Sequence, residues 1–337
     1  MSEGFHIPIL FLIFNRLNTE QQVFDQIRKV KPCKLYISAD GPRDYIDGEK
    51  TLCEEARSIV NQIDWECEVH TRFLDKNLGC AKAISSGITW FFSHEPEGII
   101  LEDDCVPHPD FFKYCEELLH RYRDNTRIMC ISGDSLDAPI NDDGKESYIF
   151  TRQARIWGWA TWKRAWNLYD LNLSDWKESS KIIQADTYYD MNHLYREERL
   201  MKGDYYHHTL NPDTWDAQWG ITIAQNKGLS IVPRKALVSN IGDTGVHYSK
   251  QTDKTSLFKS TEEIYSTNGL IHPHTISENM DLERMIMDYS INKYKKYKIA
   301  LSAGYIMRQC HILPTFWKIH PVRVGNYILK TVRKIKQ

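Results

Sequence analysis

Three consecutive acidic residues, Glu102, Asp103 and Asp104, directly follow a short apolar run at residues 98–101. The run predicts a buried strand, which places the carboxyl groups at its carboxyl end. Adjacent carboxylates repel one another, and burying them is costly unless a positive charge is held beside them. Mg²⁺ and Mn²⁺ prefer oxygen ligands, usually one or two carboxylates with water and substrate phosphate. The triplet therefore indicates a divalent cation that carries a phosphate ligand, with Mn²⁺ or Mg²⁺ as the expected cofactor.

Taken alone, the triplet has a second explanation. Asp110 opens a helical pattern a few residues later, so the acids are also compatible with a solvated turn before a helix. The neighbouring elements are needed to choose between a cation site and such a turn.

Apolar runs and helical patterns alternate through the first 135 residues. The predicted strands cover residues 7–14, 34–40, 67–73, 98–101 and 127–132, and the predicted helices cover 19–30, 49–63, 80–93 and 110–123. This alternation predicts an α/β fold with a mostly parallel sheet flanked by helices, in which ligands bind beyond the carboxyl ends of the strands. Arg16, Asp40 and the acidic triplet follow such ends, so we expect them to converge.

The second half of the chain is rich in tryptophan. Trp157, Trp159, Trp162 and Trp166 lie close together in sequence. The motif Trp-Asp-x-x-Trp at residues 215–219 opens a predicted helix that runs to about residue 226. Strands are predicted at 148–151, 229–232 and from 237, helical segments at 181–189 and 192–201, and a Gly-rich loop before residue 247.

Together these segments resemble a nucleotide-sugar glycosyltransferase of the GT-A fold, in particular the inverting N-acetylglucosaminyltransferase I family and its bacterial relatives. The matching segments are Phe14-Asn15-Arg16, Asp40, Leu101-Glu102-Asp103-Asp104, Gly158-Trp159, Trp215-Asp216-x-x-Trp219 and Gly245-Val246-His247. The segment Asn77-Leu78-Gly79-x-x-Lys82 resembles the one under the nucleotide in inverting bacterial glycosyltransferases. The resemblance implies a Rossmann-like nucleotide-sugar half at 1–135, an acceptor-side half at 136–255 and a basic helical extension at 256–337.

The resemblance also implies roles on the donor side. Asp104 would bind the metal ion directly, while Glu102 and Asp103 would accept hydrogen bonds from sugar and ribose hydroxyls. A UDP-sugar is the expected donor. The other expected nucleotide-sugar contacts are Phe14, Asn15, Arg16, Asp40 and Lys82. For Lys82 taken alone, a solvated position on a helix is the better explanation.

On the acceptor side, Asp216 is the candidate general base, because transfer to an alcohol needs a carboxylate that takes the hydroxyl proton. Its alternative is a helix N-terminal acid that complements the helix dipole. The expected acceptor-side contacts are Trp157, Trp159, Trp215 and His247. For each tryptophan the alternative is ordinary core packing, and for the histidine it is a surface position.

Composition limits the classes of function. The 337 residues are 42% hydrophobic and 26% charged with a net charge of −2, which is typical of a globular protein and gives no general attraction for nucleic acid. The eight cysteines include no Cys-x-x-Cys pair. We find no signal peptide or transmembrane segment, so a cytoplasmic location is expected, unlike the membrane-anchored eukaryotic members of the family.

Residues after Asp288 include no acid and many lysines and arginines, interleaved with aromatic residues. This basic tail is explained either by a helical appendage with a solvated face or by peripheral contact with the anionic inner face of the cytoplasmic membrane. Membrane contact would suit a lipid-linked glycan acceptor.

The sequence therefore predicts a metal-dependent inverting glycosyltransferase that acts on a glycan or glycolipid in bacterial surface polysaccharide synthesis. One alternative is a sugar-phosphate nucleotidyltransferase, but such enzymes need a Gly-rich loop after the first strand, and residues 14–18 contain no glycine. The other alternative is a non-catalytic protein that binds glycan or membrane on the same scaffold.

Overall fold

The structure is a computed structural model that describes residues 4–135, 144–175, 214–242, 269–278 and 283. Nearly all of them belong to one compact unit made of Met1–Leu136, Asn141–Leu171 and Asp213–Glu278. A second unit comprises Asp137–Ile140, Asn172–Pro212 and Asn279–Gln337. The helices predicted at 181–189 and 192–201, the whole basic tail after Asp288 and most of the Gly-rich loop lie outside the described residues.

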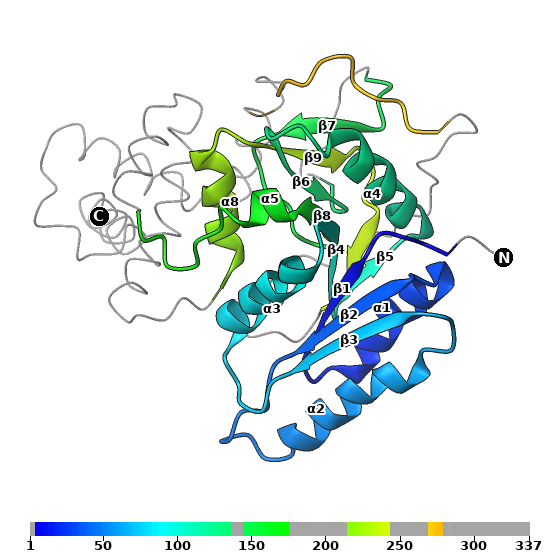
Figure 1. Cartoon of the computed structure of the whole chain (residues 1–337), viewed down its shortest axis with the longest axis vertical. Coiled ribbons are helices and arrows are strands. Elements are labelled where there is room, and N and C mark those ends of the chain that lie inside the picture. The colour runs from blue at the N-terminus through cyan, green and yellow to red at the C-terminus, as the bar shows by residue number, and fades with distance from the viewer. Residues whose placement is uncertain (1–3, 136–143, 176–213, 243–268, 279–282, 284–337) are drawn as a thin grey trace, which may run out of the picture. The chain divides into compact units, whose positions relative to one another are not determined.

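A mixed, mostly parallel sheet forms the centre of the first unit (Figure 1). Within the described residues its eight strands run in the spatial order β3 (Glu68–Phe73), β2 (Lys34–Ala39), β1 (Ile9–Ile13), β4 (Glu97–Glu102), β8 (Trp159–Trp162), β6 (Ile128–Ser132), β9 (Leu229–Pro233) and β7 (Tyr148–Thr151). The pairs β2–β3, β1–β2, β1–β4 and β6–β9 are parallel, whereas β8 and β7 pair antiparallel with their neighbours. The predicted α/β fold with a mostly parallel sheet flanked by helices is confirmed.

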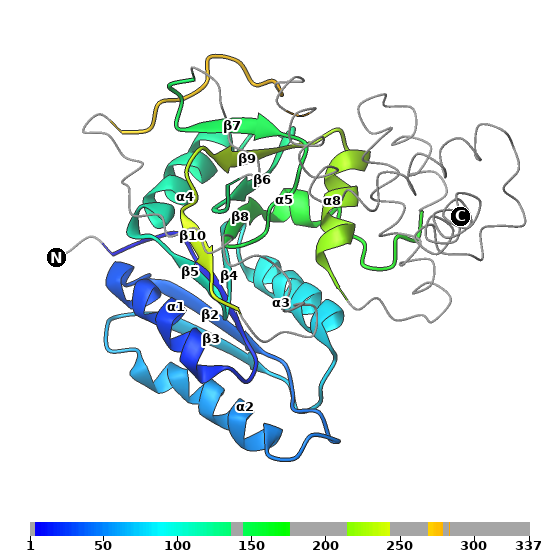
Figure 2. The same ribbon diagram turned by 180° about the vertical axis from the view of Figure 1, so that it is seen from behind.

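Helices cover both faces of the sheet (Figures 1 and 2). The helices of the described residues are α1 (Leu17–Val30), α2 (Glu49–Arg57), the 3₁₀ helix η1 (Ser58–Gln62), α3 (Cys80–His94), α4 (Pro109–Tyr122), α5 (Lys163–Trp166) and α8 (Asp216–Gln225). Side chains of α1 and α4 belong to one hydrophobic core, and those of α3, α5 and α8 belong to the other.

Strand β1 explains why both faces must be covered. Phe11 lies in the core that includes α1 and α4, while its neighbours Leu10 and Leu12 lie in the core that includes α3 and α8. Successive side chains of a strand point to opposite faces, so a continuous apolar run can be buried only between two layers.

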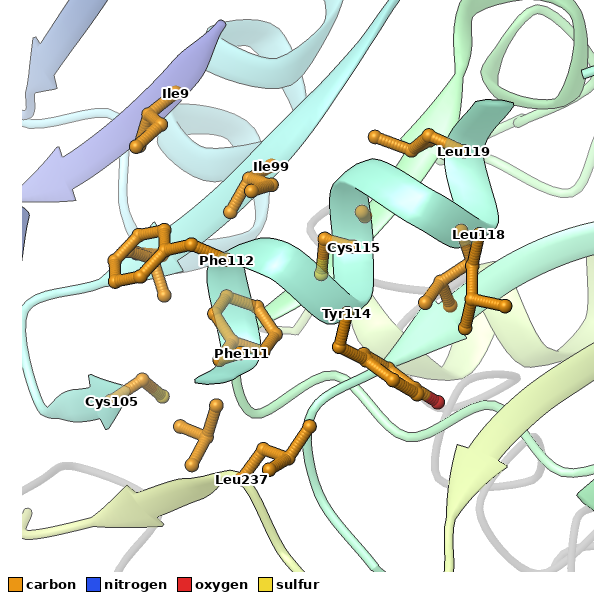
Figure 3. Packing of buried hydrophobic residues seen from close by; sticks show 14 of the residues in the cluster. Ile9, Ile99, Cys105, Phe111, Phe112, Tyr114, Cys115, Leu118, Leu119 and Leu237 are labelled. Carbon is orange, nitrogen blue, oxygen red and sulfur yellow. The ribbon is translucent and has the colours of Figure 1, made fainter. Parts of the chain in front are cut away.

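The packing of α4 shows how one of these layers is filled. Phe111, Phe112, Cys115 and Leu118 project from the helix toward the apolar side chains of the sheet, among them Ile99 (Figure 3). Helical spacing brings these positions onto one stripe of α4, which explains the predicted helix at 110–123. No helix in the described part of the chain has the length and apolarity needed to cross a membrane.

Two strands differ from the prediction. Residues 159–162 form β8, which runs antiparallel between β4 and β6, so β6 does not pair directly with β4. Residues Cys105–Pro107 form a short strand, β5, which pairs antiparallel with β10 (Val238–Asn240). Asp103 and Asp104 form a turn between β4 and β5, and the chain then enters a two-stranded ribbon before α4.

Candidate active site

Three neighbouring parallel strands, β2, β1 and β4, bring the candidate donor-side residues together where these strands end. The carboxyl ends of these strands are called the carboxyl edge of the sheet below. Arg16 follows β1, Asp40 follows β2, and Glu102 is the last residue of β4. Because the strands are parallel, their carboxyl ends lie side by side. The structure thus brings together the segments that the sequence analysis expected to converge.

Arg16 contacts two of the three acids. Its Nε and Nη2 atoms donate to the two carboxylate oxygens of Asp103, with Nε 3.1 Å from Oδ2. Its Nη2 atom also lies 3.2 Å from Oδ2 of Asp104. Although burial acts in the opposite direction, Asp103 and Asp104 raise the pKa of the Arg16 guanidinium. The positive charge that the adjacent carboxylates require is therefore supplied, in this structure, by arginine.

Burial affects the acids differently. The side chain of Asp103 is only 5% exposed, whereas that of Asp104 is 16% exposed. Burial raises the pKa of Asp103, and Arg16 opposes that rise. Burial together with the charges of Asp104, Asp103 and Asp216 raises the pKa of Glu102 well above its usual range. Asp104 is thus the more accessible of the two acids that contact Arg16.

Glu20 fixes the backbone of the segment that carries Arg16. This role of Glu20 was not expected from the sequence. Its Oε1 atom accepts hydrogen bonds from the backbone N–H groups of Phe14 (3.3 Å) and Arg16 (3.1 Å). The residue is fully buried, and burial raises the pKa of its carboxyl group. The available signal was an acid in the first turn of a helix that follows a strand, which is also common without any function.

The β5–β10 ribbon holds Asp104 from the other side. The backbone N–H of Ile241 donates to the carbonyl oxygen of Asp104 (2.8 Å), and the Cys105 thiol lies 3.5 Å from Oδ1 of Asp104. A Cβ atom added at Gly242 would collide with Oδ2 of Asp104. Any larger residue at position 242 would force this carboxylate to shift; the sequence analysis placed Gly242 in a Gly-rich loop but gave it no such role.

These observations test whether the residues fit the expected metal ion. Among the described residues, no group of three or more His, Cys, Asp or Glu side chains is arranged to bind one. Mg²⁺ and Mn²⁺ sites in nucleotide enzymes often need only one or two carboxylates, because substrate phosphates complete the coordination. Asp104 offers a partly exposed carboxylate in the space left by Gly242. The donor set fits a cation that arrives with a diphosphate.

Asp216, which is far from the acidic triplet in sequence, also acts on this region. It is the first residue of α8, and its charge is among the causes that raise the pKa of Glu102. The Tyr169 hydroxyl donates to the carbonyl oxygen of Trp215 (3.0 Å), the residue before Asp216. The structure therefore places the candidate base within electrostatic reach of the acidic triplet.

The side chains of Trp159 and Trp215, which were expected on the acceptor side, are buried in the core. Their exposed fractions are 0% and 2%, and their rings stack with centroids 5.6 Å apart. Trp166 and Trp219 complete the cluster. Apolar rings gain more by packing together in the core than by facing water, so these side chains hold α8 against the sheet. Trp157 is partly exposed beside this edge, with the Arg155 guanidinium 5.8 Å from its ring centre.

We expect Trp159→Ala to lower the free energy of unfolding by about 3–5 kcal/mol, because it empties a fully buried site. Trp157→Ala serves as the matched change at a partly exposed ring and should cost clearly less stability. Urea unfolding followed by circular dichroism measures both variants. Equal losses in the free energy of unfolding would contradict the assignment of Trp159 to the core and of Trp157 to a partly exposed position.

Asp40 has a structural role that the sequence analysis did not foresee. Its Oδ1 atom accepts from the N–H groups of Gly41 (2.8 Å) and Leu78 (2.9 Å), and its Oδ2 atom accepts from Asn77 Nδ2 (3.0 Å) and the N–H of Gly79 (3.1 Å). The carboxylate thus shapes the loop that precedes α3. Its contact with a nucleoside stays a prediction.

The remaining donor-side residues lie beside this edge. Asn15 Nδ2 donates to Glu49 (2.9 Å), which is buried and forms an ion pair with Arg43. The Arg43 guanidinium lies 5.7 Å from the ring centre of Phe14. Arg43 and Glu49 are neighbours that the sequence analysis missed.

Lys82 is exposed on the first turn of α3. His247 lies outside the described residues. Their roles toward the donor and acceptor stay predictions.

Comparisons with known proteins give no further guide to this site. No protein-family model matches the chain, and a search of curated proteins finds no match. The function is therefore inferred from the residues of the site.

Proposed function

We propose that this protein is a metal-dependent inverting glycosyltransferase of the GT-A fold, which moves a sugar from a nucleotide-sugar to a hydroxyl group of a glycan or glycolipid. The observation that carries the proposal is the cluster at the carboxyl edge of the sheet. Arg16 links Asp103 and Asp104 there, and the charge of Asp216 acts on Glu102 from α8. Such an edge is where α/β sheets bind nucleotides.

On the donor side, Asp104 would hold the cation, and the cation would supply electrostatic stabilisation for the charge that builds on the leaving diphosphate. Arg16 lies beside Asp104 and suits a phosphate, because its guanidinium can donate two parallel hydrogen bonds. We expect Glu102 to bind a donor hydroxyl. Asp103 keeps Arg16 in place.

On the acceptor side, Asp216 would act as the general base. The acceptor oxygen forms a bond to the anomeric carbon while the bond from that carbon to the diphosphate oxygen breaks, so the electron pair leaves with the nucleotide. The acceptor proton passes to the carboxylate of Asp216. One displacement of this kind inverts the anomeric centre. The partly exposed ring of Trp157 offers an apolar face for the acceptor sugar.

A sugar-phosphate nucleotidyltransferase is less well supported. In that class the backbone N–H groups after the first strand face the phosphates. Here Glu20 accepts hydrogen bonds from two of these groups, those of Phe14 and Arg16. The same N–H groups are therefore not directed at a ligand.

Calorimetry with UDP and Mn²⁺ tests the proposal. We expect UDP to bind at least about tenfold more tightly with Mn²⁺ than with EDTA, because a cation joins the diphosphate to Asp104. A panel of nucleotide-sugars with Mn²⁺, read by hydrolysis or transfer, then identifies the donor. If no nucleoside diphosphate binds in the presence of Mn²⁺ or Mg²⁺, the protein is a non-catalytic binder or belongs to another class of enzyme.

The acceptor we propose is a bacterial surface glycan, either free or attached to a lipid carrier. A cytoplasmic protein that touches the inner membrane surface through its basic tail would reach a lipid-linked acceptor. The whole tail lies outside the described residues, so this part of the proposal depends on the charge pattern of the sequence.

A further inference from the structure

Acids from two parts of the chain, Glu20 and residues 102–104, act on the guanidinium of Arg16. Its charge acts on Glu20 in α1, on Glu102 at the end of β4, and on Asp103 and Asp104 in the following turn. Uncompensated carboxylates in such a partly buried cluster would repel one another strongly. Arg16 is thus the positive charge with which this acidic cluster pairs directly, through Asp103 and Asp104.

The guanidinium of Arg16 pairs with Asp103 through two nitrogen atoms, and one of these atoms also lies close to Asp104. Nε and Nη2 both donate to Asp103, which is nearly buried, so this end of the contact is firmly positioned. Nη2 also lies 3.2 Å from Oδ2 of Asp104, which is the more accessible acid. The same oxygen faces the space left by Gly242.

We propose that Arg16 competes with a divalent cation for Asp104, so that the protein binds the free cation weakly and binds the cation–diphosphate complex well. Two positive groups cannot share Oδ2 of Asp104 without strong repulsion. A diphosphate changes this balance, because it offers the guanidinium new anionic oxygens while Asp103 still holds Nε. The part of the inference that concerns diphosphate rests on the proposed function, whereas the competition for Asp104 does not.

The test is a titration with Mn²⁺ alone, followed by electron paramagnetic resonance of the free ion, and then with Mn²⁺ and UDP together. Arg16→Met removes the charge, and Arg16→Lys keeps it. Arg28→Met is the matched control, because Arg28 also pairs with one carboxylate, that of Asp64, through Nε and Nη2, but on an exposed surface.

We expect Arg16→Met to bind Mn²⁺ alone at least about tenfold more tightly than the original protein, since a neighbouring positive charge has been removed. The same variant should bind the Mn²⁺–UDP complex more weakly. Arg16→Lys and Arg28→Met should stay within about threefold of the original affinity for Mn²⁺ alone. If Arg16→Met binds Mn²⁺ no more tightly than the original protein does, the competition is disproved.

Removing Arg16 leaves Asp103 buried without its partner, which can prevent folding. The double variant Arg16→Met/Asp103→Asn removes that charge and keeps Asp104, and the same criterion applies to it. Thermal melting shows which variant is folded. If UDP binds to none of the proteins but loss of Arg16 still strengthens Mn²⁺ binding, the proposed function fails while the competition for Asp104 stands.

Discussion

Replacing Asp216 with asparagine is expected to lower the turnover number by about 10²–10⁴-fold, the usual contribution of a positioned general base. Asparagine has nearly the same shape as aspartate but cannot accept the proton of the acceptor hydroxyl. Asp216 is the first residue of α8, and its charge is among the causes that raise the pKa of Glu102, so under the proposed function it would serve the acceptor side. Binding of the nucleotide, which involves the opposite side of the site, should change by no more than about twofold.

The measurement is single-turnover transfer with the donor identified by the nucleotide-sugar panel, together with calorimetry of UDP binding. Asp124→Asn is the matched control, because Asp124 is an exposed acid that follows α4 near the start of β6. The variant at Asp216 also loses a favourable contact with the helix dipole, so melting temperatures must accompany the rates. Turnover within tenfold of the original rate would rule out Asp216 as the base.

Asp104→Asn should remove the dependence of nucleotide binding on Mn²⁺. Without the carboxylate, the cation has lost its expected protein ligand, so UDP binding in the presence of Mn²⁺ should fall to its level in EDTA, at least about tenfold weaker than in the original protein. Binding in EDTA should be nearly unchanged, because Arg16 remains paired with Asp103. The difference between the two conditions therefore isolates the role of Asp104.

Asp64→Asn provides the control for this change. Asp64 is an exposed acid paired with Arg28. It precedes β3, so it lies at the amino ends of the parallel strands, away from the site at their carboxyl ends. It should leave UDP binding unaltered under both conditions. If Asp104→Asn retains full Mn²⁺-dependent binding of UDP, then the cation is bound elsewhere and the acidic triplet has only a structural role.

The fold was predictable where a local pattern and tertiary packing demand the same residues. The apolar runs of β1, β2 and β4 are long enough to be buried between two layers, and the stripe on α4 has the helical period. The strand β8 was not predictable in this way. Its sequence, Trp-Ala-Thr-Trp, is short and does not alternate, and its place between β4 and β6 depends on pairing with both neighbours.

The candidate site divides in a similar way. Parallel strands place their carboxyl ends together whatever side chains follow, so the convergence of Arg16 with the acidic triplet could be inferred from sequence order. For any single tryptophan core packing was already the better explanation, but which rings pack together, as those of Trp159 and Trp215 do, could not be read from sequence order. Nor could the hydrogen bonds from Asp40 to the loop before α3.

The amino-acid sequence by itself determined the layered α/β sheet and the edge at which its acids gather, since hydrophobic periodicity and strand direction act over short stretches of chain. Only the tertiary structure decided that Arg16 pairs with Asp103 and Asp104, and that Glu20 holds the backbone beneath them. The contacts of Arg16 join residues that are distant in sequence, and that of Glu20 depends on the conformation of its side chain. The energies of both depend on how much water the surrounding elements exclude.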